Sequence, residues 1–191
     1  MPKWIERFGS LCVQQGIIQK DQLPWFIYGL EKRISSFLVA IPFFLLSLFL
    51  TSLECTLSFF MTFFLLRRKT NGYHAKSLVA CLYISLLLEI FLLNVIYILL
   101  PEHFILFLAI IGMLFICKLA PYNHPNMNYT QAEISACRLT SRIYACALTF
   151  LAILASTVGL YELSKGFLLG ITMTAVLLCM AYISEWRKRN E

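Results

Sequence analysis

Long apolar stretches separated by short polar segments dominate the 191-residue chain. The stretches without Lys or Arg occupy residues 34–66, 77–100, 104–117, 143–161 and 166–184. A helix needs about 20 apolar residues, with a range of roughly 17–25, to cross the hydrocarbon core of a bilayer. Three of these stretches, 77–100, 143–161 and 166–184, have that length. The shorter stretch 104–117 reaches it when it is extended to residues 103–120. The pattern predicts an all-α, polytopic integral membrane protein.

Residues 34–66 are too long for a single crossing. As one helix, these 33 residues would extend roughly 50 Å at about 1.5 Å each, whereas the hydrocarbon core is about 30 Å thick. Segment 1–33 carries five Lys and Arg and segment 67–76 carries four, so both belong on the cytoplasmic side by the positive-inside rule. An even number of crossings must connect them, which predicts two spans separated near residues 51–54.

The same rule orients the rest of the chain. Segments 118–142 and 185–191 are basic, whereas 101–103 and 162–165 together hold one Lys. Fifteen of the 16 Lys and Arg then lie inside. We therefore predict one membrane domain over residues 1–191, with six transmembrane helices and both termini in the cytoplasm. The predicted spans are about 34–51, 53–66, 77–100, 103–120, 143–161 and 166–184.

Composition supports this class. The chain is 60% hydrophobic and 14% charged, whereas soluble domains average about 25% charged residues. This excludes a disordered chain and argues against a soluble domain. The net charge of +6 follows from the loop topology, so we expect contact with anionic lipid head groups and no nucleic acid partner.

The cytoplasmic segment 1–33 has a helical amphipathic pattern at its start. Apolar residues recur at i, i+1, i+4, i+7 and i+8, with charged and polar residues between them; they are Trp4, Ile5, Phe8, Leu11 and Cys12. Such a pattern is typical of a helix that lies in the plane of the head groups. We predict an interfacial helix ahead of the first span.

Cysteine and histidine spacing gives one candidate for chemistry. The seven cysteines form no C-x-x-C pair and the three histidines form no H-x-x-x-H pattern, so we expect neither a metal site nor a cofactor. Cys81 follows His74 by seven residues, after a basic segment. If Ser77 caps the next helix, Cys81 lies near its first turn, where the helix N-terminus and nearby cations favour the thiolate. A nearby imidazole can then act as its base.

The pair requires a bend in the chain. Residues seven apart on one continuous helix are about 10 Å apart along its axis, so the side chains meet only if residues 72–74 are non-helical. Gly72 makes such a bend easier because it tolerates positive φ. From spacing alone, an interfacial His74 and a core Cys81 remain the alternative interpretation.

Two acidic residues are also candidates. Glu89 lies near the middle of the third span, where an ionisable residue is a candidate for a functional role. We expect its carboxyl to be protonated and either to form a hydrogen bond to another helix or to face a polar cavity. Glu31 lies at the cytoplasmic mouth of the first span. It can reach His74 or a basic substrate segment, or form a surface salt bridge with Lys32 or Arg68.

The run Arg67…Gly72-x-His74-Ala75…Cys81 resembles the signature of the accessory gene regulator B (AgrB) family. These proteins are bacterial membrane cysteine endopeptidases of peptide quorum sensing. Residues 28–31 (Tyr-Gly-Leu-Glu) and the Ala-Pro…Pro loop at 120–125 are similar to further family segments. The chain departs from the family in the residues before His74, where a Gly-Gly pair is common, and in a less basic loop after Pro125.

The resemblance implies His74 and Cys81 as the catalytic pair. It also implies supporting or substrate-binding roles for nearby residues, which are Arg67, Gly72, Arg68, Lys76 and Glu31. The cations in this set could attract an acidic peptide tail.

The implied activity is that of an AgrB-like endopeptidase in the bacterial cell membrane, with its active site on the cytoplasmic side. It would cleave the C-terminal tail of an AgrD-like precursor and cyclise the signal peptide to a thiolactone or lactone. The family also suggests a homodimer. The alternative is a non-enzymatic six-helix transporter or assembly partner built around Glu89 and Asn94.

Overall fold

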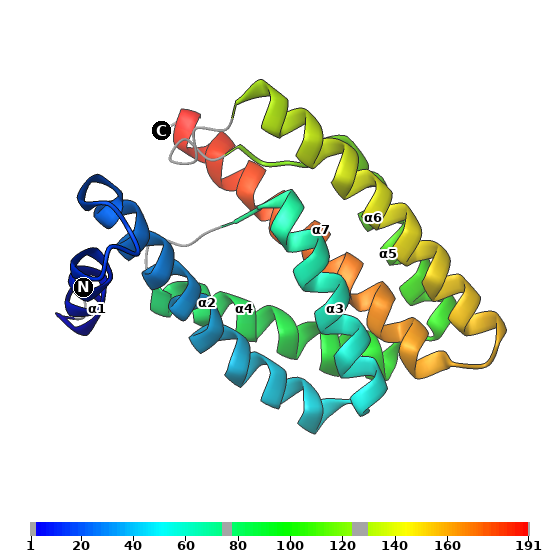
Figure 1. Cartoon of the computed structure of the whole chain (residues 1–191). Coiled ribbons are helices and arrows are strands. Elements are labelled where there is room, and N and C mark those ends of the chain that lie inside the picture. Colours follow the sequence, from blue (N-terminus) through cyan, green and yellow to red (C-terminus); the bar gives the residue numbers. More distant parts are fainter. Residues whose placement is uncertain (1–2, 74–77, 124–129, 191) are drawn as a thin grey trace. The chain divides into compact units, whose positions relative to one another are not determined.

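The computed structural model describes residues 3–73, 78–123 and 130–190, and within these ranges it contains helices and no strands. This confirms the predicted all-α class. The chain divides into two units, Met1–Phe43 and Phe44–Glu191, which are described separately below. Figure 1 shows the order of the helices along the chain.

The first unit begins with the predicted amphipathic helix, α1 (Lys3–Gln14). A 3-10 turn, η1 (Lys20–Gln22), leads into α2 (Leu23–Leu50), which continues into the second unit. Ile5 and Cys12 of α1 are buried, whereas Trp4, Phe8 and Leu11 are about half exposed. The apolar residues of α1 are therefore divided between a buried set and an exposed set. The placement of α1 in the head-group plane stays a prediction.

The predicted break in residues 34–66 is confirmed as a turn between two helices. Helix α2 ends at Leu50, and α3 (Leu53–Thr70) begins after Ser52, whose hydroxyl accepts a hydrogen bond from the main-chain N–H of Cys55 at 3.2 Å. Such an N-cap satisfies one of the main-chain N–H groups that a helix start leaves without a partner.

The remaining helices belong to the second unit. They are α4 (Leu78–Phe91), the π-helical segment η2 (Leu92–Tyr97), α5 (Glu102–Leu119), α6 (Gln131–Thr157) and α7 (Tyr161–Asn190). Several of them continue beyond the predicted spans, because a helix can extend past the bilayer into polar sequence. The capping box of Thr130 and Glu133 starts α6 in this way, twelve residues before the predicted span at 143.

Helix α7 is the centre of this unit and packs against α3, α5 and α6 (Figure 1). Gly166 and Gly170 allow its backbone to approach α3 closely: a Cβ atom at Gly170 would lie 2.6 Å from the Cβ of Thr62 and 2.9 Å from the carbonyl oxygen of Phe59. This Gly-x-x-x-Gly spacing is typical of close helix packing in membranes.

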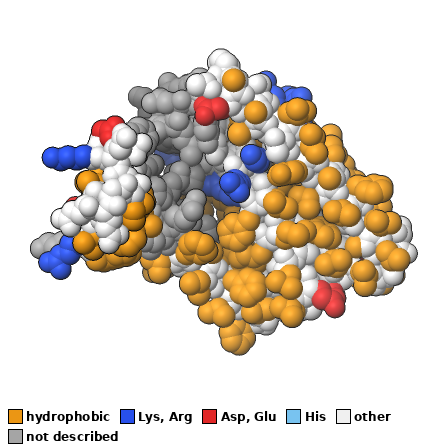
Figure 2. Space-filling view, viewed as in Figure 1, with side chains coloured by type: hydrophobic (Ala, Val, Ile, Leu, Met, Phe, Trp, Pro, Cys, Tyr) orange, Lys and Arg blue, Asp and Glu red, His pale blue; other side chains and the backbone are white. Residues whose placement is uncertain are grey.

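Three helices in the described part of the chain are long and apolar enough to cross a membrane: Glu102–Leu119, Gln131–Thr157 and Tyr161–Arg187. Helices α5 and α6 leave most of their apolar residues uncovered by protein, and Figure 2 shows hydrophobic side chains over much of one face. This large exposed apolar surface is consistent with a membrane protein. The count of six spans and the cytoplasmic termini stay predictions.

Candidate active site

The described part of the candidate site is a sharp turn that follows α3. Arg67, in the last turn of α3, donates a hydrogen bond from Nη2 to the carbonyl oxygen of Tyr73 at 2.5 Å. Gly72 lies between them with φ +104°, and a Cβ atom there would overlap the Arg67 guanidinium and lie 3.3 Å from the carbonyl oxygen of Leu177. Only glycine takes this conformation without strain and also leaves room for the guanidinium. Gly72 and Tyr73 are non-helical, which is the condition that the predicted pairing of His74 and Cys81 sets for these two residues.

Main-chain hydrogen bonds attach this turn to α7 and to the loop after α5. The N–H of Tyr73 donates to the carbonyl oxygen of Leu177 at 3.0 Å, and the N–H of Tyr122 donates to the carbonyl oxygen of Thr70 at 3.0 Å. Asn71 Nδ2 donates to the carbonyl oxygen of Tyr122 at 3.2 Å. Thr70, Asn71 and Gly72 are buried. The chain path through residues 70–73 is therefore held by partners on α7 and on the loop after α5.

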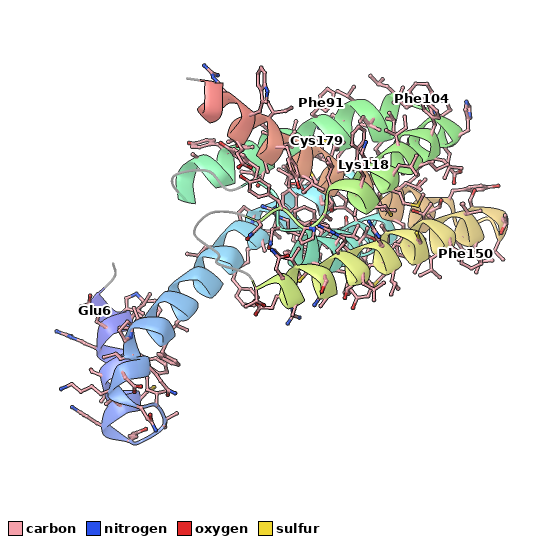
Figure 3. The ribbon with its side chains drawn as sticks, turned by 90° about the horizontal axis from the view of Figure 1, so that it is seen from above. Glu6, Phe91, Phe104, Lys118, Phe150 and Cys179 are labelled. Atoms are coloured by element: carbon pink, nitrogen blue, oxygen red, sulfur yellow. The ribbon has the colours of Figure 1, made fainter. Side chains whose placement is uncertain are left out.

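The C-terminal end of α5 is held beside the same part of α7. The phenol of Tyr182 donates to the carbonyl oxygen of Leu119 at 2.7 Å, and its ring packs edge-on against Tyr122 at 5.3 Å. Figure 3 labels Lys118, the residue before Leu119 in α5, and Cys179, three residues before Tyr182 in α7. Tyr122, which directly follows the Ala-Pro pair at 120–121, thus supports the turn at Gly72.

Of the two predicted catalytic residues, His74 lies in the interval 74–77, which is outside the described residues and also contains Lys76. Cys81 follows this interval. Helix α4 begins at Leu78 and includes the backbone of Cys81 in its first turn, as predicted; the side chain of Cys81 is outside the description. The proposed contact between imidazole and thiol therefore stays a prediction.

The other predicted residues occupy different positions. Arg68 is exposed beside Arg67 at the end of α3. Glu31 belongs to α2 in the first unit, and its side chain is outside the description. Glu89 of α4 is fully buried, and neither carboxyl oxygen has a hydrogen-bond partner among the described residues. The expected hydrogen bond from Glu89 to another helix is thus not observed there.

Sequence reasoning missed the residues that support the turn. Asn71 takes φ +58° and reaches Tyr122, which is 51 residues further along the chain. An Asn-Gly pair is a turn signal, so Asn71-Gly72 could have been identified as a turn from the sequence. The partners Tyr122 and Leu177 could not, because no local pattern links them to this turn. Among the described residues, no group of three His, Cys, Asp or Glu side chains could hold a metal ion.

These observations define an all-helical chain with helices apolar enough to cross a membrane, and with a buried polar turn beside a basic helix end. The sequence model of the accessory gene regulator B family matches residues 6–180. The chain therefore belongs to the accessory gene regulator B family, as the motif resemblance indicated. Membership implies a role in processing the accessory gene regulator peptide, whose AgrD precursor is the general partner of this family. No curated relative and no solved structure matches the chain at a significant level.

Proposed function

We propose that this protein is a membrane cysteine endopeptidase that cleaves and cyclises an AgrD-like precursor peptide, with Cys81 as nucleophile and His74 as general base. The alternative of a non-enzymatic transporter lacks a comparable supporting observation. The observation that carries the proposal is the double anchoring of Tyr73, the residue before His74. Its N–H is bound to Leu177 and its carbonyl oxygen to Arg67.

This anchoring gives His74 a defined starting point. A residue that follows an anchored backbone group has few directions available, and a catalytic imidazole must be held within about 3 Å of the thiol whose proton it accepts. Cys81 follows seven residues later in the first turn of α4, where the main-chain N–H groups of the helix start stabilise a thiolate. Contact between the imidazole of His74 and the thiol of Cys81 is the part of the proposal that the experiments below test.

The proposed reaction proceeds through an acyl-enzyme. The Cys81 thiolate adds to the carbonyl carbon of the scissile peptide bond, and the tetrahedral intermediate expels the amine of the C-terminal tail. The imidazolium of His74 gives its proton to that amine. The signal segment remains as a thioester on Cys81.

Ring closure regenerates the enzyme. A Cys or Ser side chain of the bound peptide gives its proton to His74 and attacks the thioester carbonyl. The Cys81 sulfur leaves as thiolate, and the peptide is released as a thiolactone or lactone. Water must be excluded during this step, since hydrolysis of the thioester would release a linear peptide.

The proposal gives Arg67 a role other than attraction of the acidic tail. Its guanidinium binds the carbonyl oxygen of Tyr73 and packs on Gly72, so we assign it to positioning the turn. Arg68, which is exposed one residue later, and Lys76 are the better candidates for attracting the acidic tail of a precursor. This charge attraction would be sensitive to salt, whereas the contact of Arg67 would not.

The test is co-expression of the full chain with an AgrD-like precursor, followed by mass spectrometry of the peptide products. Cys81→Ala and His74→Ala are expected to abolish cleavage, whereas Cys81→Ser should accumulate uncleaved precursor or a slowly formed ester. Cys137→Ala, at a partly buried cysteine on α6, is the matched control and should cleave normally.

Two results separate the interpretations. A covalent adduct between chain and signal segment, which disappears in Cys81→Ala and survives in Cys137→Ala, supports the acyl-enzyme. If Cys81→Ala and His74→Ala both release the cleaved tail at the rate of the parent chain, the endopeptidase proposal is wrong and a transport or assembly role becomes the better hypothesis.

A further inference from the structure

The end of the second unit opposite the Gly72 turn contains a cavity of about 290 Å³. It lies between the start of α5, the end of α6 and the start of α7. Its walls combine three aliphatic side chains with four polar ones; they are Leu106, Ile153, Leu168, Glu102, His103, Ser156 and Ser164. Phe104, labelled in Figure 3, follows His103 directly and marks this end of α5. No step of the proposed peptide reaction uses this cavity.

Ser164 differs from the other helical hydroxyls of α7. Thr172, Thr174 and Ser184 each donate to a main-chain carbonyl oxygen three or four residues earlier, at 2.8 to 2.9 Å. Such a bond is the usual way to satisfy a buried hydroxyl within a helix. Ser164 is 1% exposed and lines the cavity, yet its Oγ has no hydrogen-bond partner among the described residues. Its hydroxyl therefore has a hydrogen bond to offer to a bound group.

Glu102 is only partly buried, and one of its two carboxyl oxygens shares this property. Glu133, in the first turn of α6, accepts a hydrogen bond from the N–H of Thr130 at 2.8 Å, and Glu162 accepts one from the phenol of Tyr97 at 2.6 Å. The Oε1 atom of Glu102 is buried, and no partner for it lies in the part of the chain that the structure describes. A buried carboxylate oxygen without a partner costs free energy, and a bound donor would remove that cost.

The charge of the lining selects a cation. No Lys or Arg lines the cavity. The nearest basic residue along the chain, Lys165, is directed at Glu162 at 3.4 Å and lies over the ring of Tyr97 at 4.8 Å. A metal ion fits poorly, because Glu102 and His103 are consecutive on a helix and consecutive side chains do not face each other.

We propose that this cavity binds a primary ammonium group. Such a group has one positive charge for Glu102 and three N–H donors, which suit a carboxylate oxygen and two serine hydroxyls. A quaternary ammonium has the same charge and no N–H donor, so the cavity should discriminate against it. The aliphatic residues, Leu106, Ile153 and Leu168, would pack around the short carbon chain that carries the ammonium.

Two sources can supply this group. One is the ethanolamine head group of a phospholipid, since α5 and α6 expose apolar side chains such as Phe107 and Phe150 in the turns that adjoin the cavity walls. The other is a free small amine. At about 30 Å³ per water molecule, a cavity of about 290 Å³ has room for about ten waters, so either source could insert its ammonium group and the carbon chain next to it.

The test uses the purified full chain. In nanodiscs of phosphatidylglycerol with either phosphatidylethanolamine or phosphatidylcholine, the thermal midpoint and the retained lipids are measured, the latter by native mass spectrometry. In detergent, ethanolamine is compared with tetramethylammonium. We expect the primary ammonium to bind about tenfold more tightly, which corresponds to about 1.4 kcal/mol. Preference only in nanodiscs identifies the lipid; preference in both identifies the shared ammonium chemistry.

Glu102→Gln and Ser164→Ala should each reduce this preference to less than about threefold. Glu54→Gln, at an exposed acid in the first turn of α3, is the matched control and should keep it. Should Glu102→Gln fail to fold, Ser164→Ala alone still tests the site. Equal binding of primary and quaternary ammonium, displacement by Mg²⁺, or an unchanged preference in both variants would overturn the proposal and leave a cavity that holds water only.

Discussion

The two ends of the Phe44–Glu191 unit are held together by different kinds of contact. At one end, the turn after α3 is attached mainly through main-chain groups, with Arg67 and Asn71 each donating to a carbonyl oxygen. At the other end, Glu162 of α7 contacts side chains from the turn before α3, from η2 and from α7 itself. It accepts hydrogen bonds from Tyr97 at 2.6 Å and Ser52 at 3.3 Å, and Lys165 lies 3.4 Å away.

The difference suggests that the Gly72 turn serves positioning and that the contacts around Glu162 serve stability. Main-chain contacts define the path of the chain at the Gly72 turn as far as Tyr73. Side-chain contacts around Glu162 join the helix ends and tolerate small changes in backbone position. Changes at the Gly72 turn should therefore reduce the proposed peptide cleavage, with or without a loss of stability. Changes around Glu162 should reduce stability with little effect on cleavage.

The largest effect is expected from Arg67→Met. The variant removes the donor that holds the carbonyl oxygen of Tyr73, and a misplacement of catalytic groups by about 1 Å can cost about 100-fold in rate. We expect cleavage of the co-expressed precursor to fall by about that factor, with the thermal midpoint much less affected. Lys118→Met, at an exposed cation of α5, is the control; an equal loss there would indicate a general charge effect.

Gly72→Ala is expected to be next in size. Gly159 also has positive φ, at +81°, but a Cβ atom there would meet nothing within 4 Å, whereas one at Gly72 would overlap Arg67. Both substitutions place a Cβ atom on a backbone with positive φ, which is strained. Only Gly72→Ala also crowds the Arg67 side chain. We expect Gly72→Ala to lower the free energy of unfolding by about 2 kcal/mol more than Gly159→Ala, measured by denaturation in detergent. Equal losses would mean that the crowding is relieved elsewhere.

A smaller effect on stability is expected at the other end from Tyr97→Phe. The change removes a hydrogen bond to a charged carboxylate, which is worth about 1.5 kcal/mol. Cleavage should stay within about threefold of the parent, because the change is remote from the Gly72 turn. Tyr83→Phe, at an exposed tyrosine of α4, should leave the thermal midpoint unchanged. A cleavage loss as large as that of Arg67→Met would contradict the proposed roles of the two ends.

The smallest effect is expected from Lys165→Met. This partly exposed ion pair is 3.4 Å long, with side-chain exposures of 24% and 34%, and such pairs contribute at most about 1 kcal/mol. The loss should shrink further in high salt if it is electrostatic. A salt-independent loss would instead assign the effect to packing of the Lys165 chain on Tyr97.

Much of the helical framework could be predicted from the sequence. The length of the 34–66 run required a break, and the structure places it at residues 51–52. Amphipathic spacing predicted α1, and the Gly72 bend was expected because seven residues of continuous helix would separate His74 from Cys81. These predictions depend on local properties, namely helix rise, apolar length and the conformational freedom of glycine.

The role of Arg67 could not be predicted in the same way. As a sequence feature it is one of three consecutive basic residues, and charge alone suggested attraction of an acidic tail. The structure distinguishes it from Arg68, because one side chain reaches Tyr73 and the other is exposed. The acceptor that the Arg67 guanidinium reaches depends on where the backbone turns. The charge pattern of the sequence does not give that position.

The sequence by itself determined the class of this protein: apolar length, basic segments and the motif from Arg67 to Cys81 indicate a helical membrane protein of the accessory gene regulator B family. Only the tertiary structure decided which distant residues support each end of the bundle. Tyr122 and Leu177 reach the Gly72 turn, and Tyr97 reaches Glu162, from 51 to 104 residues away. Such partners are chosen by helix packing, so no local pattern in the sequence identifies them.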